Sequence, residues 1–283
     1  MPQEVLQWIG GGPGAVLVDG TLGGGGHTRL LAERVGPTGQ VIALDRDPAA
    51  LAHAEATLRG LPIRLVQSSY SDLPEILEQL EIPAVDGILL DLGFSSDQLA
   101  NADRGFSFSS VGPLDLRFDP TAGKPAWRLL ERLSAENLAN LIYQYGEERY
   151  SRRIAAKIVA RRKDQPVRTA ADLADLIRGC VPKSARHGDI HPATRTFQAL
   201  RIAVNEELKW LEVALKRIPA CLAPGGRIVA ISYHSLEDRI VKHAFREDER
   251  LEVLTRRPVR PSAVEVARNP RARSAKLRVA ERS

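Results

Sequence analysis

The chain has 283 residues, of which 43% are hydrophobic, so it can bury a full core. No apolar run reaches the roughly 18 residues of a membrane span, and no N-terminal pattern indicates secretion, so we expect a cytoplasmic protein without membrane contact. Cys180 and Cys221 lack a Cys or His partner at metal-ligand spacing, so no metal site is expected. The net charge of +5 is concentrated in two basic stretches, residues 149–168 and 250–283.

Short apolar runs alternate with helical segments in the first part of the chain. A helix is expected at residues 28–35, and another after Asp47-Pro48 with Asp47 as its N-cap. We predict buried parallel strands at residues 15–18, 41–44, 87–90 and 227–231. This alternation predicts an α/β fold with a Rossmann-like, doubly wound sheet, which binds ligands beyond the carboxyl ends of its strands.

The alternation stops after Leu92. Residues 104–188 contain no convincing strand, and the pattern resumes with one long helix at 192–217 and a last strand at 276–280, after a loop at 257–273. Within the interruption we predict helices at 135–145, 152–162 and 170–180. We therefore predict a discontinuous sheet domain, residues 1–103 and 189–283, with a helical insertion at residues 104–188.

A glycine-rich loop, residues 20–27, joins the first strand to its helix. Its glycines let the backbone approach a ligand closely, and Asp45, at the end of the second strand, can accept hydrogen bonds from ribose hydroxyls. Dinucleotide enzymes share these features. Asp19, however, precedes the glycines, and this acid would repel a pyrophosphate but suit the cationic methionyl half of S-adenosylmethionine. The charge therefore favours the methyl donor.

Asp91 ends the third predicted strand, and Phe94 follows three residues later. Methyltransferases that act on base amines place a polar residue and an aromatic residue at these positions. A carboxylate there can accept an N–H of the weakly nucleophilic amine, and the aromatic ring can stack on an extruded base. His234 leaves the last core strand at the same edge of the sheet, where it either lines the base pocket or makes a structural hydrogen bond.

These motifs resemble one family closely, the bacterial ribosomal RNA small-subunit methyltransferase H family, also called MraW. The matching segments span nearly the whole chain: residues 19–28 (DGTLGGGGHT), 43–48 (ALDRDP), 86–96 (DGILLDLGFSS), 104–108 (RGFSF), 112–115 (GPLD), 145–148 (YGEE), 191–201 (HPATRTFQALR), 234–239 (HSLEDR) and 269–278 (NPRARSAKLR). The family usually opens with His-x-Pro-Val-Leu, whereas this chain begins partway through that segment.

The resemblance implies a class I methyltransferase that methylates the N4 amine of a cytidine in the decoding region of 16S rRNA, with S-adenosylmethionine as cosubstrate. It also implies a set of donor-binding residues: Gly24, Gly25, Gly26, His27, Asp45, Tyr70, Asp91 and Gln98. Tyr70 stands where the family often has Phe, so stacking on adenine is retained. Asp91 has two candidate roles, donor contact and amine acceptor, and the resemblance favours the first. The catalytic candidates are Asp91, Phe94 and His234.

The two basic stretches predict contact with RNA, as 16S rRNA or the small ribosomal subunit, because clustered positive charge attracts a phosphate backbone. A solvated helix face and a disordered tail would explain the same composition. Three other functions remain as alternatives: an NAD-dependent dehydrogenase, a DNA amino-methyltransferase, whose tetrapeptide the chain approximates with Leu-Gly in place of Pro-Pro, and a non-enzymatic RNA-binding protein.

Overall fold

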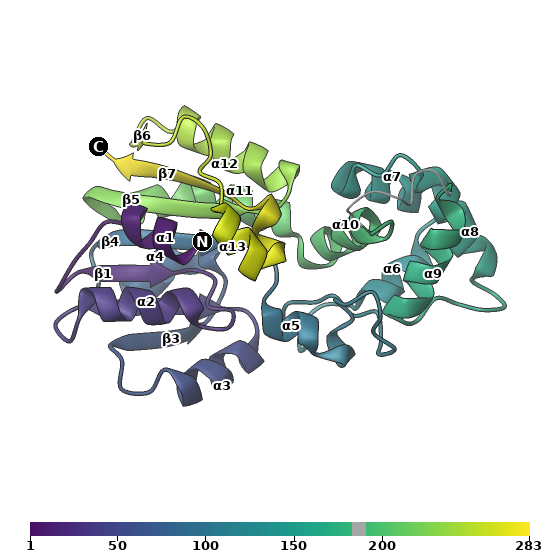
Figure 1. Cartoon of the computed structure of the whole chain (residues 1–283), viewed down its shortest axis with the longest axis horizontal. Helices are drawn as coiled ribbons and strands as arrows, with labels where there is room; N and C mark the ends of the chain where they lie inside the picture. The colour runs from purple at the N-terminus through teal and green to yellow at the C-terminus, as the bar shows by residue number, and fades with distance from the viewer. Residues whose placement is uncertain (183–190) are drawn as a thin grey trace. The chain divides into compact units, whose positions relative to one another are not determined.

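The computed structural model describes residues 1–182 and 191–283 (Figure 1). The chain divides into two compact units. The sheet unit comprises Met1–Gly93 and Leu208–Ser283, and the helical unit comprises Phe94–Glu207. The domain boundary expected between residues 188 and 189 lies outside the described residues.

The sheet unit contains seven strands in the order β3-β2-β1-β4-β5-β7-β6. Neighbouring strands from β3 to β5 are parallel, whereas β7 runs antiparallel to both β5 and β6. The strands are β1 (Val16–Asp19), β2 (Gln40–Asp45), β3 (Ile63–Gln67), β4 (Val85–Asp91), β5 (Leu222–Ser232), β6 (Leu251–Val253) and β7 (Lys276–Arg282). This sheet confirms the predicted Rossmann-like α/β fold and each of the predicted strands.

Helices cover both faces of the sheet, because successive strand residues point to opposite sides. Leu17 packs into a cluster with α1 (Pro2–Trp8) and α2 (Gly26–Val35). Val18 packs on the other face, in a cluster that includes buried residues of α4 (Leu73–Gln79), α11 (Glu207–Arg217) and α12 (Ser235–Glu247). The middle strands are therefore buried on both faces, which explains why they are continuous apolar runs rather than alternating ones.

Strand β1 lies between β2 and β4, so the chain reverses its direction across the sheet at this point. In doubly wound sheets, ligands bind outside the carboxyl ends of the strands at such a reversal. The N-cap of α3 (Pro48–Thr57) is Asp47, as predicted, and its side chain accepts a hydrogen bond from the amide of Ala49 at 3.1 Å. The predicted N-cap of this helix is therefore confirmed.

The helical unit forms its own hydrophobic core. Its helices are α5 (Ser96–Ala100), α6 (Ala126–Arg132), α7 (Ala135–Gly146), α8 (Ser151–Arg161), α9 (Ala170–Cys180) and α10 (Thr194–Asn205), so the three helices predicted inside the insertion are confirmed. Helices α7 and α10 pack closely at Gly146, where a Cβ atom would overlap the backbone carbonyl of Arg195. No strand occurs among the described residues of this unit.

The prediction of one long helix at residues 192–217 is wrong. Two helices, α10 and α11, are separated by Glu206, whose left-handed backbone (φ 51°) ends α10. Phe197 and Leu200 of α10 belong to the core of the helical unit, whereas Leu211 of α11 belongs to a core of the sheet unit. The apolar residues of this region therefore belong to two different hydrophobic cores. The change from one core to the other explains why the sheet unit resumes at Leu208 and not at residue 189.

Other differences are local. The helical unit begins at Phe94 instead of residue 104. The segment expected to be a loop at residues 257–273 contains α13 (Ala263–Arg268), which begins at the N-cap Ser262. Over the described residues, no helix is both long and apolar enough to cross a bilayer.

Candidate active site

Three aspartates end adjacent strands of the sheet. Asp19 ends β1, Asp45 ends β2 and Asp91 ends β4, and the sheet order places β1 between the other two strands. Since the carboxyl ends of parallel strands lie at one edge, the predicted acids come together there, next to the glycine loop.

The glycine loop turns sharply from β1 into α2. Gly25 is the N-cap of α2 with φ 76°, Gly26 is its first residue, and Gly24 precedes them in the loop. Gly23 also has a positive φ, of 50°. At Gly20 a Cβ atom would lie 2.7 Å from a side-chain carbon of Leu90, so the loop passes β4 too closely for any larger residue. The glycines are therefore required by backbone conformation and by space.

Asp19 is completely buried and holds the glycine loop in place. Its carboxylate accepts a hydrogen bond from the Thr28 hydroxyl at 2.7 Å and another from the Thr21 amide at 3.1 Å. Burial raises the pKa of Asp19, and these hydrogen bonds oppose the rise. Asp19 therefore fixes the conformation of the loop and has no exposed surface of its own.

Asp45 links the second strand to the same loop. Its Oδ2 accepts a hydrogen bond from the Gly23 amide at 2.8 Å, and its Oδ1 accepts one from the Asp47 amide at 2.9 Å. Burial raises the pKa of Asp45, opposed by these amide hydrogen bonds. Each carboxylate oxygen has two lone pairs, so both oxygens retain the capacity to accept a ribose hydroxyl.

Asp91 has two carboxylate oxygens in different environments. Oδ1 accepts a hydrogen bond from the Tyr233 hydroxyl at 2.9 Å, while Oδ2 lies 3.6 Å from Nε2 of His27. Its backbone amide donates to the Thr21 hydroxyl at 2.7 Å, which ties β4 to the glycine loop. Burial raises the pKa of Asp91 to about 6, and the Tyr233 hydrogen bond opposes the rise. A quarter of the side chain remains exposed, so a ligand can reach it.

His27 and Tyr70 lie at the same edge of the sheet. Burial lowers the pKa of His27, which favours a neutral imidazole at neutral pH, and its Nδ1 is buried without a hydrogen-bond partner. Tyr70 begins the short 3-10 helix that follows β3, and its Cβ approaches Gly20. The predicted residues of the sheet unit are thus brought together around the glycine loop.

Gln98 and Phe94 belong to the helical unit. Gln98 is in the first turn of α5 and completes a capping box, in which its Oε1 accepts the Ser95 amide at 3.0 Å. The Phe94 ring is 38% exposed and stacks on Phe106 with a centroid distance of 5.2 Å. The guanidinium of Arg201 lies 5.2 Å from the Phe94 ring centroid. Phe94 therefore keeps an accessible aromatic surface.

His234 is the N-cap of α12. Its Nδ1 accepts a hydrogen bond from the Glu237 amide at 3.3 Å, and its Nε2 lies 3.0 Å from Oε1 of Glu237. These contacts agree with the second of the two predicted roles of His234, a structural hydrogen bond. The adjacent Tyr233, for which no individual role was predicted, is the residue that contacts Asp91. Tyr233 directly follows β5 at the carboxyl edge of the parallel strands, and this position could have identified it as a candidate site residue.

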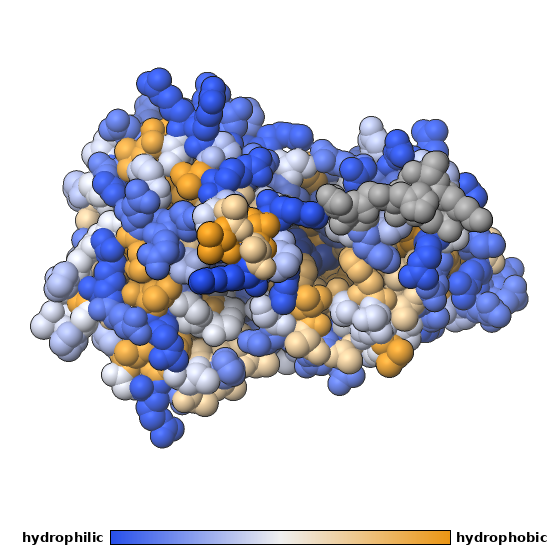
Figure 2. Space-filling view, in the orientation of Figure 1, coloured by the Kyte–Doolittle hydropathy of each residue, from blue (hydrophilic) through white to orange (hydrophobic). Residues whose placement is uncertain are grey.

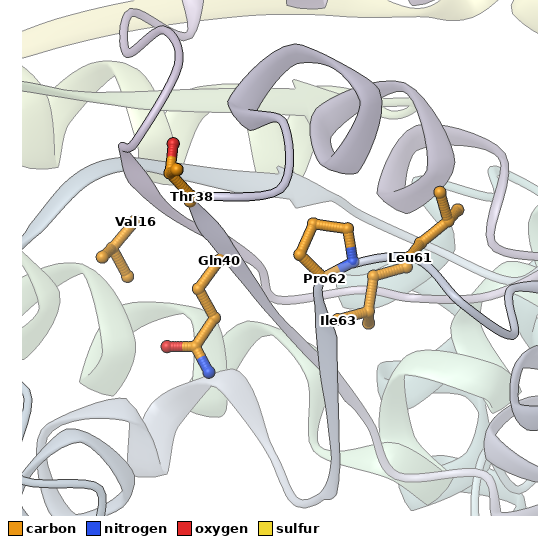
Figure 3. Close-up of a pocket in the computed structure, with 7 residues that line it drawn as sticks. Val16, Thr38, Gln40, Leu61, Pro62 and Ile63 are labelled. Carbon is orange, nitrogen blue, oxygen red and sulfur yellow. The ribbon is translucent and has the colours of Figure 1, made fainter.

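Two surface pockets of the sheet unit are lined by other residues. One is lined by Val16, Thr38, Gln40 and Ile63, at the amino ends of β1, β2 and β3, as the close-up shows (Figure 3). The other lies between α3 and β3. None of the predicted site residues lines either pocket, so neither pocket is assigned to the candidate site.

The basic stretch at residues 149–168 contains two kinds of side chain. Arg162 donates to the backbone carbonyls of Leu130 and Leu133, and Arg168 forms an ion pair with Glu131, so these arginines stabilise the helical unit. Arg152, Arg153 and Lys157 are instead exposed on α8. Figure 2 shows hydrophilic residues gathered over the part of the helical unit where Figure 1 labels α8.

The C-terminal basic stretch, residues 250–283, also contains both ion-paired and exposed basic side chains. Lys276 and Arg278 both form ion pairs with Asp238, at 2.9 Å and 2.7 Å, and thereby fix β7 to α12. Arg256, Arg257 and Arg260 are exposed in the segment between β6 and α13. Part of the positive charge in each stretch is therefore structural, and part is available to a partner.

Comparison with known proteins identifies relatives along the whole chain. A protein named ribosomal RNA small subunit methyltransferase H from Rhodopirellula baltica is 52% identical, with 100% of this chain and 90% of the relative covered. Relatives of the same name from Synechococcus elongatus and Trichlorobacter lovleyi are 52% and 49% identical, with 93% and 96% of their lengths covered.

A solved structure of an rRNA methylase from Streptococcus thermophilus covers 95% of this chain and 86% of its own, at 11% identity and a TM-score of 0.43. The assignment rests on the sequence relatives and not on this likeness. The sequence model of the MraW methylase family matches residues 1–283. The family predicted from the motifs is thus confirmed, and the chain belongs to the MraW methylase family.

Proposed function

We propose that this protein uses S-adenosylmethionine to methylate the N4 amine of a cytidine in the decoding region of 16S rRNA. The observation that carries the proposal is the convergence of the glycine loop, Asp45 and Asp91 at one sheet edge, in a chain that shares about half its residues with ribosomal RNA small subunit methyltransferases H. The proposal includes a cytoplasmic location, with 16S rRNA or the small ribosomal subunit as the partner.

The donor fits the residues of the loop. When bound, S-adenosylmethionine supplies a sulfonium methyl group. Asp45 would bind the ribose hydroxyls, and Tyr70 would stack on the adenine. The unpartnered Nδ1 of His27 supports a polar ligand at the start of α2, whose N-terminus has no side-chain cap. Gly24 of the loop, Asp91 and Gln98 are the remaining proposed donor contacts.

Asp91 would act on the target amine. The N4 lone pair of cytosine is delocalised into the ring, so the amine is a poor nucleophile. A carboxylate that accepts an N–H hydrogen bond directs the lone pair away from the ring and toward the methyl carbon. A pKa of about 6 keeps Asp91 largely ionised at neutral pH but basic enough to receive a proton. The exposed ring of Phe94 would stack on the base.

Transfer of a radiolabelled methyl group tests the activity. Purified protein is incubated with labelled donor and small ribosomal subunits, free 16S rRNA or DNA, and the nucleosides are then analysed. We expect label in N4-methylcytidine from ribosomal RNA and none from DNA. Label in DNA would support the amino-methyltransferase alternative. Binding of NAD in place of the methyl donor would support a dehydrogenase.

The helical unit would recognise the RNA through α8. Reversing Arg152 and Arg153 to Glu should raise the KM for RNA and reduce the salt dependence of RNA binding, because phosphate contacts release counterions. A control variant reverses Lys242 and Arg246, which are exposed on α12 outside both basic stretches. Loss of thermal stability in the α8 variant without a change in RNA binding would contradict this assignment.

A further inference from the structure

Tyr233 and Asp91 are 142 residues apart in the sequence and in hydrogen-bond contact in the structure. Tyr233 follows β5 directly, and β5 pairs with β4 up to Asp91 itself, which lies opposite Ile231. Two adjacent parallel strands therefore bring the phenol to the carboxylate. Burial and the neighbouring carboxylate of Asp91 raise the pKa of Tyr233, so the hydroxyl stays protonated and donates the hydrogen bond.

The contact makes the two oxygens of Asp91 inequivalent. Oδ1 accepts the Tyr233 hydrogen bond at 2.9 Å, whereas among the described residues Oδ2 accepts no hydrogen bond and lies 3.6 Å from the His27 ring, which is beyond hydrogen-bond distance. The Asp91 amide is held separately by Thr21, so the backbone is fixed as well. Oδ1 therefore keeps one free lone pair and Oδ2 keeps both, and the carboxylate is held in a fixed orientation.

We propose that Tyr233 is a positioning residue for methyl transfer, which fixes the Asp91 carboxylate so that Oδ2 receives the proton of the target amine. The inference rests on the proposed function and deepens it. As the N4 nitrogen attacks, its lone pair forms the bond to the methyl carbon, while the carbon–sulfur bond breaks and its electron pair remains on sulfur. The methylated nitrogen then loses one proton to Oδ2, and its lone pair is restored.

The same hydrogen bond sets the proton affinity of Asp91. A donor to the ionised carboxylate stabilises the charged form, so its removal raises the pKa of Asp91 further. The other titratable or charged groups that act on Asp91 are His27, Asp19, Glu237, Glu265 and the amino group of Met1. None of these is altered when only the phenolic oxygen is removed.

Tyr233→Phe tests the proposal because it keeps the ring and removes the hydroxyl. We expect kcat to fall about tenfold to a hundredfold, the usual effect of one hydrogen bond to a charged group, with the KM values for donor and RNA nearly unchanged. The acid limb of the kcat profile should move to higher pH. In an Asp91→Asn background, the same substitution should have almost no further effect, since the two residues act as one unit.

Thr255→Val is a matched control. Thr255 is also buried in the sheet unit, where its hydroxyl accepts the Val279 amide at 2.8 Å, so this variant loses a hydroxyl far from Asp91. It should lower thermal stability and leave the acid limb where it is. If Tyr233→Phe behaves like this control, with reduced stability and an unmoved acid limb, the positioning role is refuted.

A measurement without substrate separates this inference from the proposed function. The Asp91 carboxyl carbon can be titrated by ¹³C NMR in the parent and in Tyr233→Phe. We expect the pKa of Asp91 to be higher in the variant, whatever reaction the protein catalyses. An unchanged pKa would overturn the inference even if N4-methylcytidine is formed, while a raised pKa without N4-methylcytidine would refute the proposed function alone.

Discussion

Asp91→Asn is expected to make the ligand-free protein more stable. Burial raises the pKa of this carboxyl from its ordinary value of 3.8 to about 6, so the folded state binds a proton more tightly than the unfolded chain does. Ionising Asp91 at neutral pH therefore costs the native state about 3 kcal/mol. The amide of Asn is neutral and its oxygen can still accept the Tyr233 hydrogen bond, so the variant should regain about 1–3 kcal/mol.

The gain should depend on pH with a definite sign. Because the folded pKa is the higher one, the stabilising effect of this carboxyl is complete below about pH 4 and is lost as the pH rises through about 6. Thermal melts followed by circular dichroism should therefore show a higher Tm for Asp91→Asn at about pH 7.5. The difference should shrink toward pH 4.5, roughly the low end of this range.

Asp238 provides a control, because its substitution should change the stability in the opposite direction. Burial alone would raise the pKa of Asp238, but its ion pairs with Arg278 and Lys276 hold the pKa below its ordinary value. Asp238→Asn should therefore lower the Tm at neutral pH, because two cations lose their partner. If Asp91→Asn is no more stable than the parent at neutral pH, or if its advantage persists unchanged in acid, the electrostatic reasoning is refuted.

Asp91→Asn should also reduce methyl transfer by about a hundredfold or more, since an amide cannot take a proton, and the radiolabel assay measures this loss. Asp45→Ala should weaken donor binding by about 1–3 kcal/mol in calorimetry and leave RNA affinity unchanged, and equal donor affinity would remove Asp45 from the site. Gly20→Ala should lower both Tm and donor affinity, because its Cβ would lie 2.7 Å from Leu90; a Tm equal to that of the parent would show that the loop can move aside. Burial raises the pKa of Cys221 to about 11, so alkylation at neutral pH should be slow until the protein is unfolded by denaturant, and rapid labelling of the native protein would contradict this.

Local patterns predicted the middle strands of the sheet and the aspartates at their carboxyl ends. The strands that end in Asp19, Asp45 and Asp91 are apolar runs because they are covered on both faces, and such runs are visible without any knowledge of the fold. Strand β3 was missed because it is an edge strand, and Arg64 and Gln67 interrupt its apolar character. Strands that are buried on both faces were therefore predicted from the sequence, and the partly exposed edge strand was not.

Features that depend on long-range pairing could not be predicted. The left-handed residue between α10 and α11 is Glu206, and a glutamate gives no signal for that conformation. The contact between Tyr233 and Asp91 depends on β5 lying beside β4, which the strand order alone determines. His234 has a residue type that suggests chemistry, and only its contacts with Glu237 identify it as a helix cap.

The placement of β7 has a consequence for the order in which the protein can be completed during translation. Strand β7 lies between β5 and β6, so the sheet cannot close until residues 276–282 have left the ribosome. The helical unit is one continuous segment, Phe94–Glu207, and all of it is synthesised earlier. Because domains generally fold as units during synthesis, we expect the helical unit to form first, and the edge of β5 to remain unpaired until the last strand arrives.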